Sequence, residues 1–315
     1  MSSRRTDRSL ASLLLAQRLV DSHAEPLGPK EFWAVVTAVG EPERLLPGST
    51  SSGDSHAFSS ELTERIAHRM ASATSLAFEL ERLEQSGLSV LSALDDDYPA
   101  ALRERLGSTA PPILHVVGNL DLLARSGIGV VGSRNADAEA LGVAASVARE
   151  AAARGLPVVS GGARGIDQES ITAALDAGGT AVGVLADSLS RQVTKPHVRR
   201  AILEGRLCLC TPYKPTAGFS VANAMGRNRL IYALSELTLI VTSDSGQGGT
   251  WEGAVEAIRG RLTDVVIWEG AGAGPGNAAL IALGGRPADS VADVLVRGEA
   301  SSPRPFGSGQ MSLGL

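Results

Sequence analysis

Three glycine-rich turns carry the residue types that could bind a phosphate-bearing ligand. Each follows a short apolar run: residues 132–134 follow 128–131, residues 161–165 follow 156–160, and residues 246–250 follow 237–242. Glycine lets the backbone approach an anion closely, and the amino terminus of a following helix offers free N–H groups. Arginine, present in the first two turns as Arg134 and Arg164, pairs well with phosphate oxygens. The turns predict a platform for a nucleotide or a nucleic-acid backbone.

A fourth segment, Gly226-Arg227-Asn228-Arg229, is predicted to open a helix that runs to Ser235. Two arginines in a first helical turn oppose the helix dipole, so an anionic ligand would compensate them. Asn223 or Asn228 could hydrogen-bond to a base or a ribose. The alternative is a solvated basic turn.

The third glycine turn leads into a predicted helix through Gly248, Gly249, Thr250 and Glu252. Thr250 can cap this helix, and a carboxylate near an amino terminus suits the dipole. Capping alone explains Glu252, and a catalytic carboxylate is the sharper alternative. Asp167, after the second turn, is predicted to cap the helix that follows it.

Other patterns argue against several classes of protein. The string Gly127-x-Gly129-x-x-Gly132 fits the dinucleotide fingerprint literally, but its glycines run through a predicted strand instead of following it. A Walker phosphate loop and clusters of histidine and cysteine are absent from the sequence, so we expect neither a cofactor nor a metal. The basic residues around Lys195 are expected to form a solvated helix face unless that helix flanks the glycine turns.

Composition limits the partners. Of 315 residues, 43% are hydrophobic and only 3% aromatic, and the net charge is −5. Any nucleic acid must therefore meet a local positive patch, with little aromatic stacking. No apolar run reaches membrane-spanning length, and we expect a cytoplasmic protein that does not contact membranes.

Hydrophobic periodicity divides the chain. Residues 1–86 are predicted to be a small helical domain, with helices at 9–22, 31–39 and 61–86, the last broken near Ser72. Residues 87–299 alternate between strands and helices, which predicts a parallel α/β sheet with helices on both faces. Residues 300–315, rich in Ser, Pro and Gly, are expected to be disordered. The predicted strands are 88–91, 113–117, 128–132, 156–160, 180–185, 206–211, 237–242 and 264–268.

Over residues 94–283 the chain resembles the DNA-processing protein A family, also called DprA or Smf. The matching blocks are Asp97-Tyr98-Pro99, Pro111-Pro112-Ile113-Leu114, residues 130–134, residues 159–167 and Arg227-Asn228-Arg229-Leu230-Ile231. The resemblance implies a SAM-like helical domain, an extended Rossmann-like fold, and a pocket for single-stranded DNA. It also implies a homodimer that delivers DNA to a RecA-type recombinase during natural transformation. By position it puts Ser133, Arg134, Gly162, Arg164, Gly165, Arg227 and Asn228 in the pocket, with Lys195 as a weaker candidate.

The segment Gly248-Gly249-Thr250-x-Glu252 also resembles the LOG-type nucleotide phosphoribohydrolases. In that alternative the protein cleaves a nucleoside monophosphate, with Arg227, Arg229 and Glu252 as catalytic candidates. A third alternative is a regulatory partner in phage defence or a toxin–antitoxin pair. We predict a DprA-like binder of single-stranded DNA or a nucleotide, with phosphate held by Gly132, Ser133, Arg134, Gly161, Gly162, Arg164, Gly165, Lys195, Arg227, Asn228, Gly248, Gly249 and Thr250.

Overall fold

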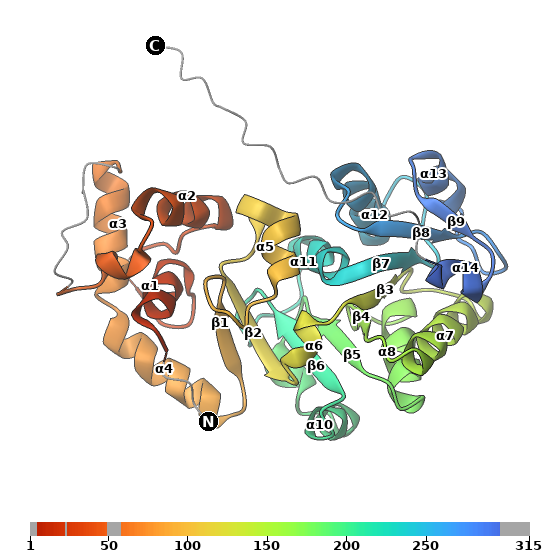
Figure 1. Cartoon of the computed structure of the whole chain (residues 1–315), viewed down its shortest axis with the longest axis horizontal. Coiled ribbons are helices and arrows are strands. Elements are labelled where there is room, and N and C mark those ends of the chain that lie inside the picture. The colour runs from red at the N-terminus through yellow and green to blue at the C-terminus, as the bar shows by residue number, and fades with distance from the viewer. Residues whose placement is uncertain (1–4, 23, 49–57, 297–315) are drawn as a thin grey trace, which may run out of the picture.

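The computed structural model describes residues 5–22, 24–48 and 58–296. A nine-stranded sheet with helices on both faces forms most of the molecule, and four further helices lie beside one edge of the sheet (Figure 1). The fold is Rossmann-like α/β, as predicted. The predicted disordered tail, residues 300–315, lies outside the described residues.

The sheet changes direction at one point. Its strand order is β1-β2-β6-β5-β4-β3-β7-β8-β9, so the chain winds outward from β3 to β6, then returns beside β3 and winds the other way from β7. The strands are β1 (Ser89–Ser92), β2 (Ile113–Gly118), β3 (Gly127–Val131), β4 (Val158–Ser160), β5 (Ala181–Val184), β6 (Leu207–Thr211), β7 (Ser235–Ile240), β8 (Asp264–Trp268) and β9 (Arg286–Ala288). The switch point between β3 and β7 is where such sheets bind ligands.

The sheet is not wholly parallel. Strand β2 pairs antiparallel with both β1 and β6, whereas β3 to β9 pair in parallel. The sequence predicted β1 and β2 but not the antiparallel direction of β2, because apolar runs look alike in either orientation. Strand β9 was not predicted, since three residues that include Pro287 carry little strand pattern.

Two apolar cores sandwich the parallel strands. The first face is covered by α7 (Ala138–Ala153), α8 (Ile166–Asp176) and α14 (Val291–Leu295). The second is covered by α11 (Val221–Leu234), α12 (Gly249–Gly260) and α13 (Asn277–Ala282) (Figure 1). Along β3, Ile128 and Val130 face the first core, and a Cβ at Gly129 would lie 2.4 Å from Oγ1 of Thr238. The glycines within β3 therefore serve close packing, which agrees with rejecting a dinucleotide fingerprint there.

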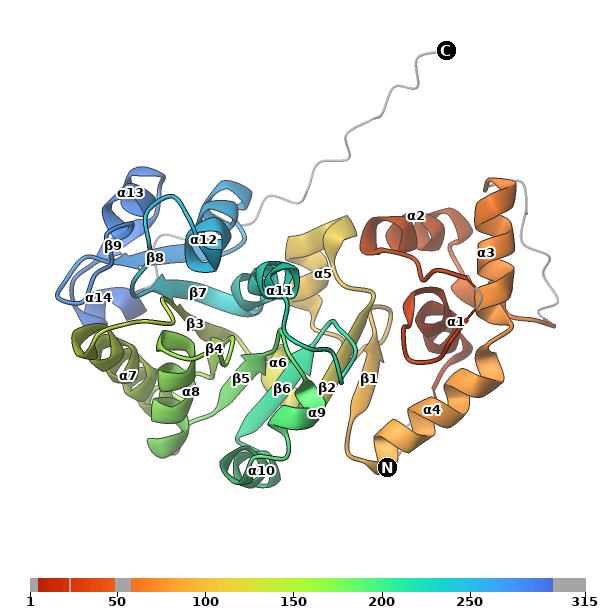
Figure 2. The same ribbon diagram turned by 180° about the vertical axis from the view of Figure 1, so that it is seen from behind.

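The helical region consists of α1 (Asp7–Ala16), α2 (Pro29–Val39), α3 (Ser60–Met70) and α4 (Ala73–Gln85). The break between α3 and α4 is where the periodicity predicted it. One continuous apolar core runs from α1 to α4 onto β1 and β2, and both views place these helices beside β1 (Figures 1 and 2). The division of the chain at residue 86 stays a prediction.

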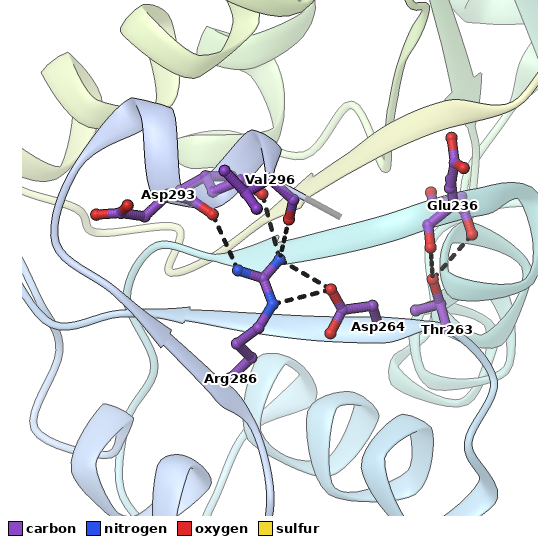
Figure 3. Close-up of polar contacts among 8 residues, drawn as sticks. Glu236, Thr263, Asp264, Arg286, Asp293 and Val296 are labelled. Atoms are coloured by element: carbon purple, nitrogen blue, oxygen red, sulfur yellow. Dashed lines mark hydrogen bonds and ion pairs between the residues drawn. The ribbon is translucent and has the colours of Figure 1, made fainter. Parts of the chain in front are cut away.

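Short connecting helices complete the fold. They are α5 (Ala100–Leu106), α6 (Asp121–Ala124), α9 (Leu189–Gln192) and α10 (Pro196–Leu203), with 3-10 turns at Pro42–Leu45 and Gly107–Thr109. At the far edge of the sheet, Arg286 donates to Oδ2 of Asp264 at 2.8 and 3.0 Å (Figure 3). The same guanidinium donates to the carbonyls of Asp293 and Val296 at the end of α14, so one side chain fastens β8, β9 and α14 together.

Candidate phosphate-binding site

The three glycine turns lie at the carboxyl ends of adjacent strands. Strands β4, β3 and β7 are neighbours in the sheet, and the turns follow them directly. The N–H of Ser133 donates to the carbonyl of Thr242 at 3.0 Å, which ties the turn after β3 to the turn after β7. The sequence prediction that these turns converge is therefore correct, and they meet at the switch point.

A cavity of about 420 Å³, hereafter the switch-point cavity, opens between these turns and α11. Nine of the predicted site residues line it: Gly132, Ser133, Arg134, Arg227, Asn228, Gly248, Gly249, Thr250 and Glu252. Helix α12 presents its amino terminus here, and Gly248 at its N-cap makes no side-chain capping bond. Such a terminus leaves backbone N–H groups free for an anion. Thr250 lies inside the helix, so the prediction that it caps α12 is wrong.

The second glycine turn supports the cavity from behind. A Cβ at Gly161 would lie 1.3 Å from Nη1 of Arg227, so only glycine leaves room for that guanidinium. Gly165 has φ +89°, and a Cβ there would meet the carbonyl oxygen of Ser133 at 2.4 Å. These glycines shape the walls without lining the cavity themselves, and Gly162 and Arg164 are likewise not among the lining residues.

Two residues predicted to bind phosphate, Arg164 and Lys195, do not line the cavity. Arg164 is exposed and donates to Oδ1 of Asn135, which itself lines the cavity. Lys195 is exposed at the start of α10 and does not line the cavity. Both views place α10 away from α12 (Figures 1 and 2). The basic set around Lys195 therefore fits the solvated helix face better than the site.

Arg227 forms the floor of the cavity. Its side chain is only 4% exposed, and its Nη1 lies 3.6 Å from Oδ2 of Asp167, which is buried as well. Among the described residues, its Nε and Nη1 have no hydrogen-bond partner. Burial lowers the pKa of Arg227, and the carboxylate of Asp167 opposes that shift. Burial also raises the pKa of Asp167, against the pull of Arg227 and of backbone groups of Gly132 and Gly161.

Two predictions about this pair were wrong in detail. Helix α11 begins at Val221, with Ser220 as its cap, so Arg227 lies in mid-helix and its position does not oppose the helix dipole. The N-cap of α8 is Gly165, and Asp167 lies in the first turn of that helix, where it pairs with Arg227 instead of capping. Helix α11 therefore begins five residues before Gly226, where the sequence had predicted its start.

The rim of the cavity is aromatic and apolar, which the sequence did not reveal. The guanidinium carbon of Arg134 lies 4.8 Å from the centroid of the Phe219 ring. Phe219 is 51% exposed, and Val221 and Met225 beside it are also exposed. Exposed apolar side chains gathered at a cavity are typical of a binding surface. The available signal was one of only five phenylalanines, set between Gly218 and Ser220.

The cavity is not uniformly basic. Asp244, in the turn after β7, and Glu252, in α12, also line the cavity. Asn228 donates to the carbonyl of Gly249 at 2.9 Å and so joins α11 to α12.

Arg229, a candidate for catalysis, does not reach the cavity. Its Nε contacts Oε1 of Glu256 at 2.6 Å, and it lines a different pocket beyond α11. The structure thus separates Arg229 from Glu252. Within the described residues, no group of three or more His, Cys, Asp or Glu side chains could hold a metal ion. No helix in the described ranges is both long and apolar enough to span a bilayer.

Comparison with known proteins agrees with the family resemblance seen in the sequence. Residues 89–297 match the family of the DNA recombination-mediator protein A. A Mycobacterium tuberculosis relative that bears the name DNA processing protein DprA is 32% identical over 204 residues, which cover 60% of this chain and 52% of the relative. The chain thus spans about half the length of such relatives.

Two solved structures show the same fold. The X-ray structure of DprA from Streptococcus pneumoniae superposes with a TM-score of 0.61 at 27% identity, covering 73% of this chain and 81% of that one. DprA from Helicobacter pylori, described for its single-stranded DNA binding mode, gives a TM-score of 0.53 at 21% identity and covers 65% and 93%. With more than half of its residues matched to the family, the chain belongs to the DNA recombination-mediator protein A (DprA) family.

Proposed function

We propose that the chain binds single-stranded DNA in the switch-point cavity and grips its phosphate backbone without reading its sequence. The observation that carries this proposal is the buried guanidinium of Arg227, whose Nε and Nη1 lack hydrogen-bond partners among the described residues. Leaving buried charged donors unpaired is costly. A phosphate oxygen that reached them would accept the hydrogen bonds that Asp167, 3.6 Å from Nη1, does not take.

Three neighbouring features support a nucleic-acid backbone over an isolated anion. Arg134 at the rim could hold a second phosphate, and the uncapped amino terminus of α12 faces the same cavity. The exposed ring of Phe219 offers a stacking surface for a base. Bases in a duplex have no free faces, so this ring favours a single strand. The binding of single-stranded DNA by the Helicobacter pylori relative agrees with this ligand.

Fluorescence anisotropy of a labelled oligonucleotide across a salt series tests the proposal. We expect binding that weakens with salt and prefers a single strand to a duplex, because each phosphate contact releases counterions. Arg134→Ala should weaken binding and lower the salt slope by about 0.7, the value for one single-strand phosphate contact. The matched control is Arg199→Ala, which removes an exposed arginine of α10. Equal behaviour of the two variants would refute the site.

Glu252 favours one second candidate function, hydrolysis of a nucleotide. Its carboxylate lines the cavity, where it could stabilise positive charge that develops on a ribose. The variant Glu252→Gln separates the two functions. A DNA binder should bind at least as tightly after the loss of this negative charge, whereas a hydrolase should lose base release from a nucleoside monophosphate.

The partners are proposed from family membership alone. We propose a cytoplasmic homodimer that delivers DNA to a RecA-type recombinase, as the family implies. Light scattering of the purified chain measures its mass in solution, and a monomer at micromolar concentration would refute the dimer. Stimulation of strand exchange by a recombinase from the same organism would test delivery.

A further inference from the structure

A second cavity, of about 300 Å³, lies on the opposite side of α11 from the switch-point cavity. Gly226, Arg229 and Leu230 line it, whereas Arg227 and Asn228 line the first cavity. This division follows from helix geometry, because residues two apart point about 200° away from each other around the axis. The other walls come from the segment after α1, from β2 and from the loop after β6. This interface cavity therefore joins the helical region to the sheet.

The buried wall of the interface cavity carries a histidine without a defined role in the fold. Ile113 and His115, two residues apart on β2, share the strand face that lines the cavity. His115 is only 5% exposed, and neither ring nitrogen makes a hydrogen bond of normal geometry to another described residue. Backbone groups of Thr211 and Tyr213 lie close by, but burial still lowers the pKa of His115 to about 4. At neutral pH the ring is uncharged, with one nitrogen to donate and one to accept.

The rim of the interface cavity is positively charged. Arg18 and Lys214 are exposed there, and Arg229, half-buried, pairs with Glu256. None of the residues that line this cavity is acidic, in contrast to the switch-point cavity. The interface cavity thus combines a basic rim, apolar walls and the neutral imidazole of His115, which can both donate and accept a hydrogen bond.

We propose that the interface cavity binds a nucleotide, with the base edge against His115 and the phosphate between Arg18 and Lys214. A neutral imidazole can both donate and accept a hydrogen bond, and the edge of a base offers groups for either. Apolar side chains such as Ile113 and Leu230 can cover the faces of the base. The volume lies at the lower end of the range of about 300–1,000 Å³ for small-molecule sites. The nucleotide is either free or one unit of a bound DNA strand.

The loop after β6 connects this site to the first one. Pro212, Tyr213 and Lys214 line the interface cavity, and Phe219 in the same loop lines the switch-point cavity. Tyr213 also donates to the carbonyl of Asn223 in α11 at 2.9 Å. The two cavities therefore share α11 and this loop as walls. The nucleotide site itself does not depend on the first cavity binding DNA.

Calorimetric titration of the full chain with deoxyadenosine monophosphate, and separately with inorganic phosphate, tests the free-nucleotide form. We expect the nucleotide to bind more tightly than phosphate, and its affinity to fall at least about tenfold in the double variant Arg18→Ala/Lys214→Ala and in His115→Leu. Arg199→Ala is the control and should leave this affinity unchanged, and Arg134→Ala shows how much of the binding takes place in the switch-point cavity. The double variant changes only exposed residues, so the test holds even if His115→Leu fails to fold.

The same variants identify the source of the nucleotide. If deoxyadenosine monophosphate does not bind, but the double variant binds a labelled oligonucleotide more weakly and with a smaller salt slope than Arg199→Ala does, the occupant is a unit of the DNA strand. Three results would overturn the proposal. They are unchanged binding of both probes in the double variant, equal affinity for phosphate and nucleotide, and nucleotide binding that Arg134→Ala alone abolishes.

Discussion

Two buried arginines, one in each half of the molecule, show how differently a fold can use the same group. Arg69 on α3 is 2% exposed and Arg227 on α11 is 4% exposed. Arg69 donates to the carbonyls of Leu14, Ala24 and Gln17, with Nε to the Leu14 oxygen at 2.9 Å. Arg227 has no hydrogen-bond partner for Nε or Nη1 among the described residues, and its Nη1 forms only an ion pair, at 3.6 Å, with the buried carboxylate of Asp167. Burial is nearly equal, but only Arg69 is satisfied.

We propose that the difference separates a structural cation from one held for a ligand. Arg69 closes the end of α1 and the segment after it, where backbone carbonyls would otherwise lack donors. Burial lowers its pKa to about 10, so it stays charged at neutral pH. Arg227 lines the switch-point cavity, and its Nη1 faces the carboxylate of Asp167 instead of backbone carbonyls. The predictions below test this contrast.

The largest effect is expected on stability, at Arg69. Arg69→Met leaves up to three carbonyl oxygens without a donor, so the free energy of unfolding should fall by about 3–5 kcal/mol. Chemical denaturation followed by circular dichroism measures this change. Arg82→Met, which removes an exposed helical arginine that pairs with Glu79, should stay close to wild type. DNA affinity should not change in either folded variant. If folded Arg69→Met bound DNA more weakly than Arg82→Met did, Arg69 would not be a purely structural cation.

His115 is a third buried basic side chain, and it differs from the two arginines because it stays neutral. Its pKa is lowered from an ordinary 6.5 to about 4, so the unfolded chain binds a proton first as the pH falls. The stability that this group contributes is complete above pH 6.5 and is lost as the pH falls towards 4. At about 1.4 kcal/mol per pKa unit, the loss approaches 3 kcal/mol.

Denaturation of wild type and His115→Leu at several pH values isolates this contribution. Between pH 7 and pH 4, wild type should lose about 3 kcal/mol more unfolding free energy than the variant. Parallel curves for the two proteins would mean that the imidazole is not protected from charging in the folded state.

A smaller effect is expected at Phe219, on binding alone. Because its ring is half exposed, Phe219→Ala should barely change stability, but the loss of one stacked base should weaken oligonucleotide binding by about 1–2 kcal/mol. Phe78→Ala on α4 is the matched control, since that ring is 70% exposed and lies outside both cavities. Anisotropy titrations compare the two, and equal affinities would remove Phe219 from the site.

The sequence predicted the parts of the site that depend on local pattern. Glycine turns after apolar runs are visible in one dimension, and the topology then brings the three turns to one edge of the sheet. The ion pair of Arg227 with Asp167 joins residues 60 positions apart, so no local pattern could reveal it. The same holds for Phe219, which is placed over Arg134 by a loop that sequence periodicity does not describe.

Helix phase explains the clearest error at the site. Arg227 and Arg229 looked equivalent at the start of a helix, but α11 begins six residues before Arg227 and the two side chains lie on opposite sides of it. Because the helix begins earlier than predicted, Arg227 and Arg229 do not lie in its first turn, and the argument that they oppose the helix dipole no longer applies. The direction of β2 was missed for a related reason, since strand pairing is a long-range property.

The most direct test of the central claim is oligonucleotide binding by the double variant Arg227→Met/Asp167→Asn. Replacing both partners avoids leaving one charge buried alone, so the unfolding free energy should stay within about 1 kcal/mol of wild type or rise. If the guanidinium of Arg227 is held for phosphate, this folded variant should bind a labelled single strand at least about tenfold more weakly, with a smaller salt slope. Wild-type affinity and slope in the folded double variant would contradict the account.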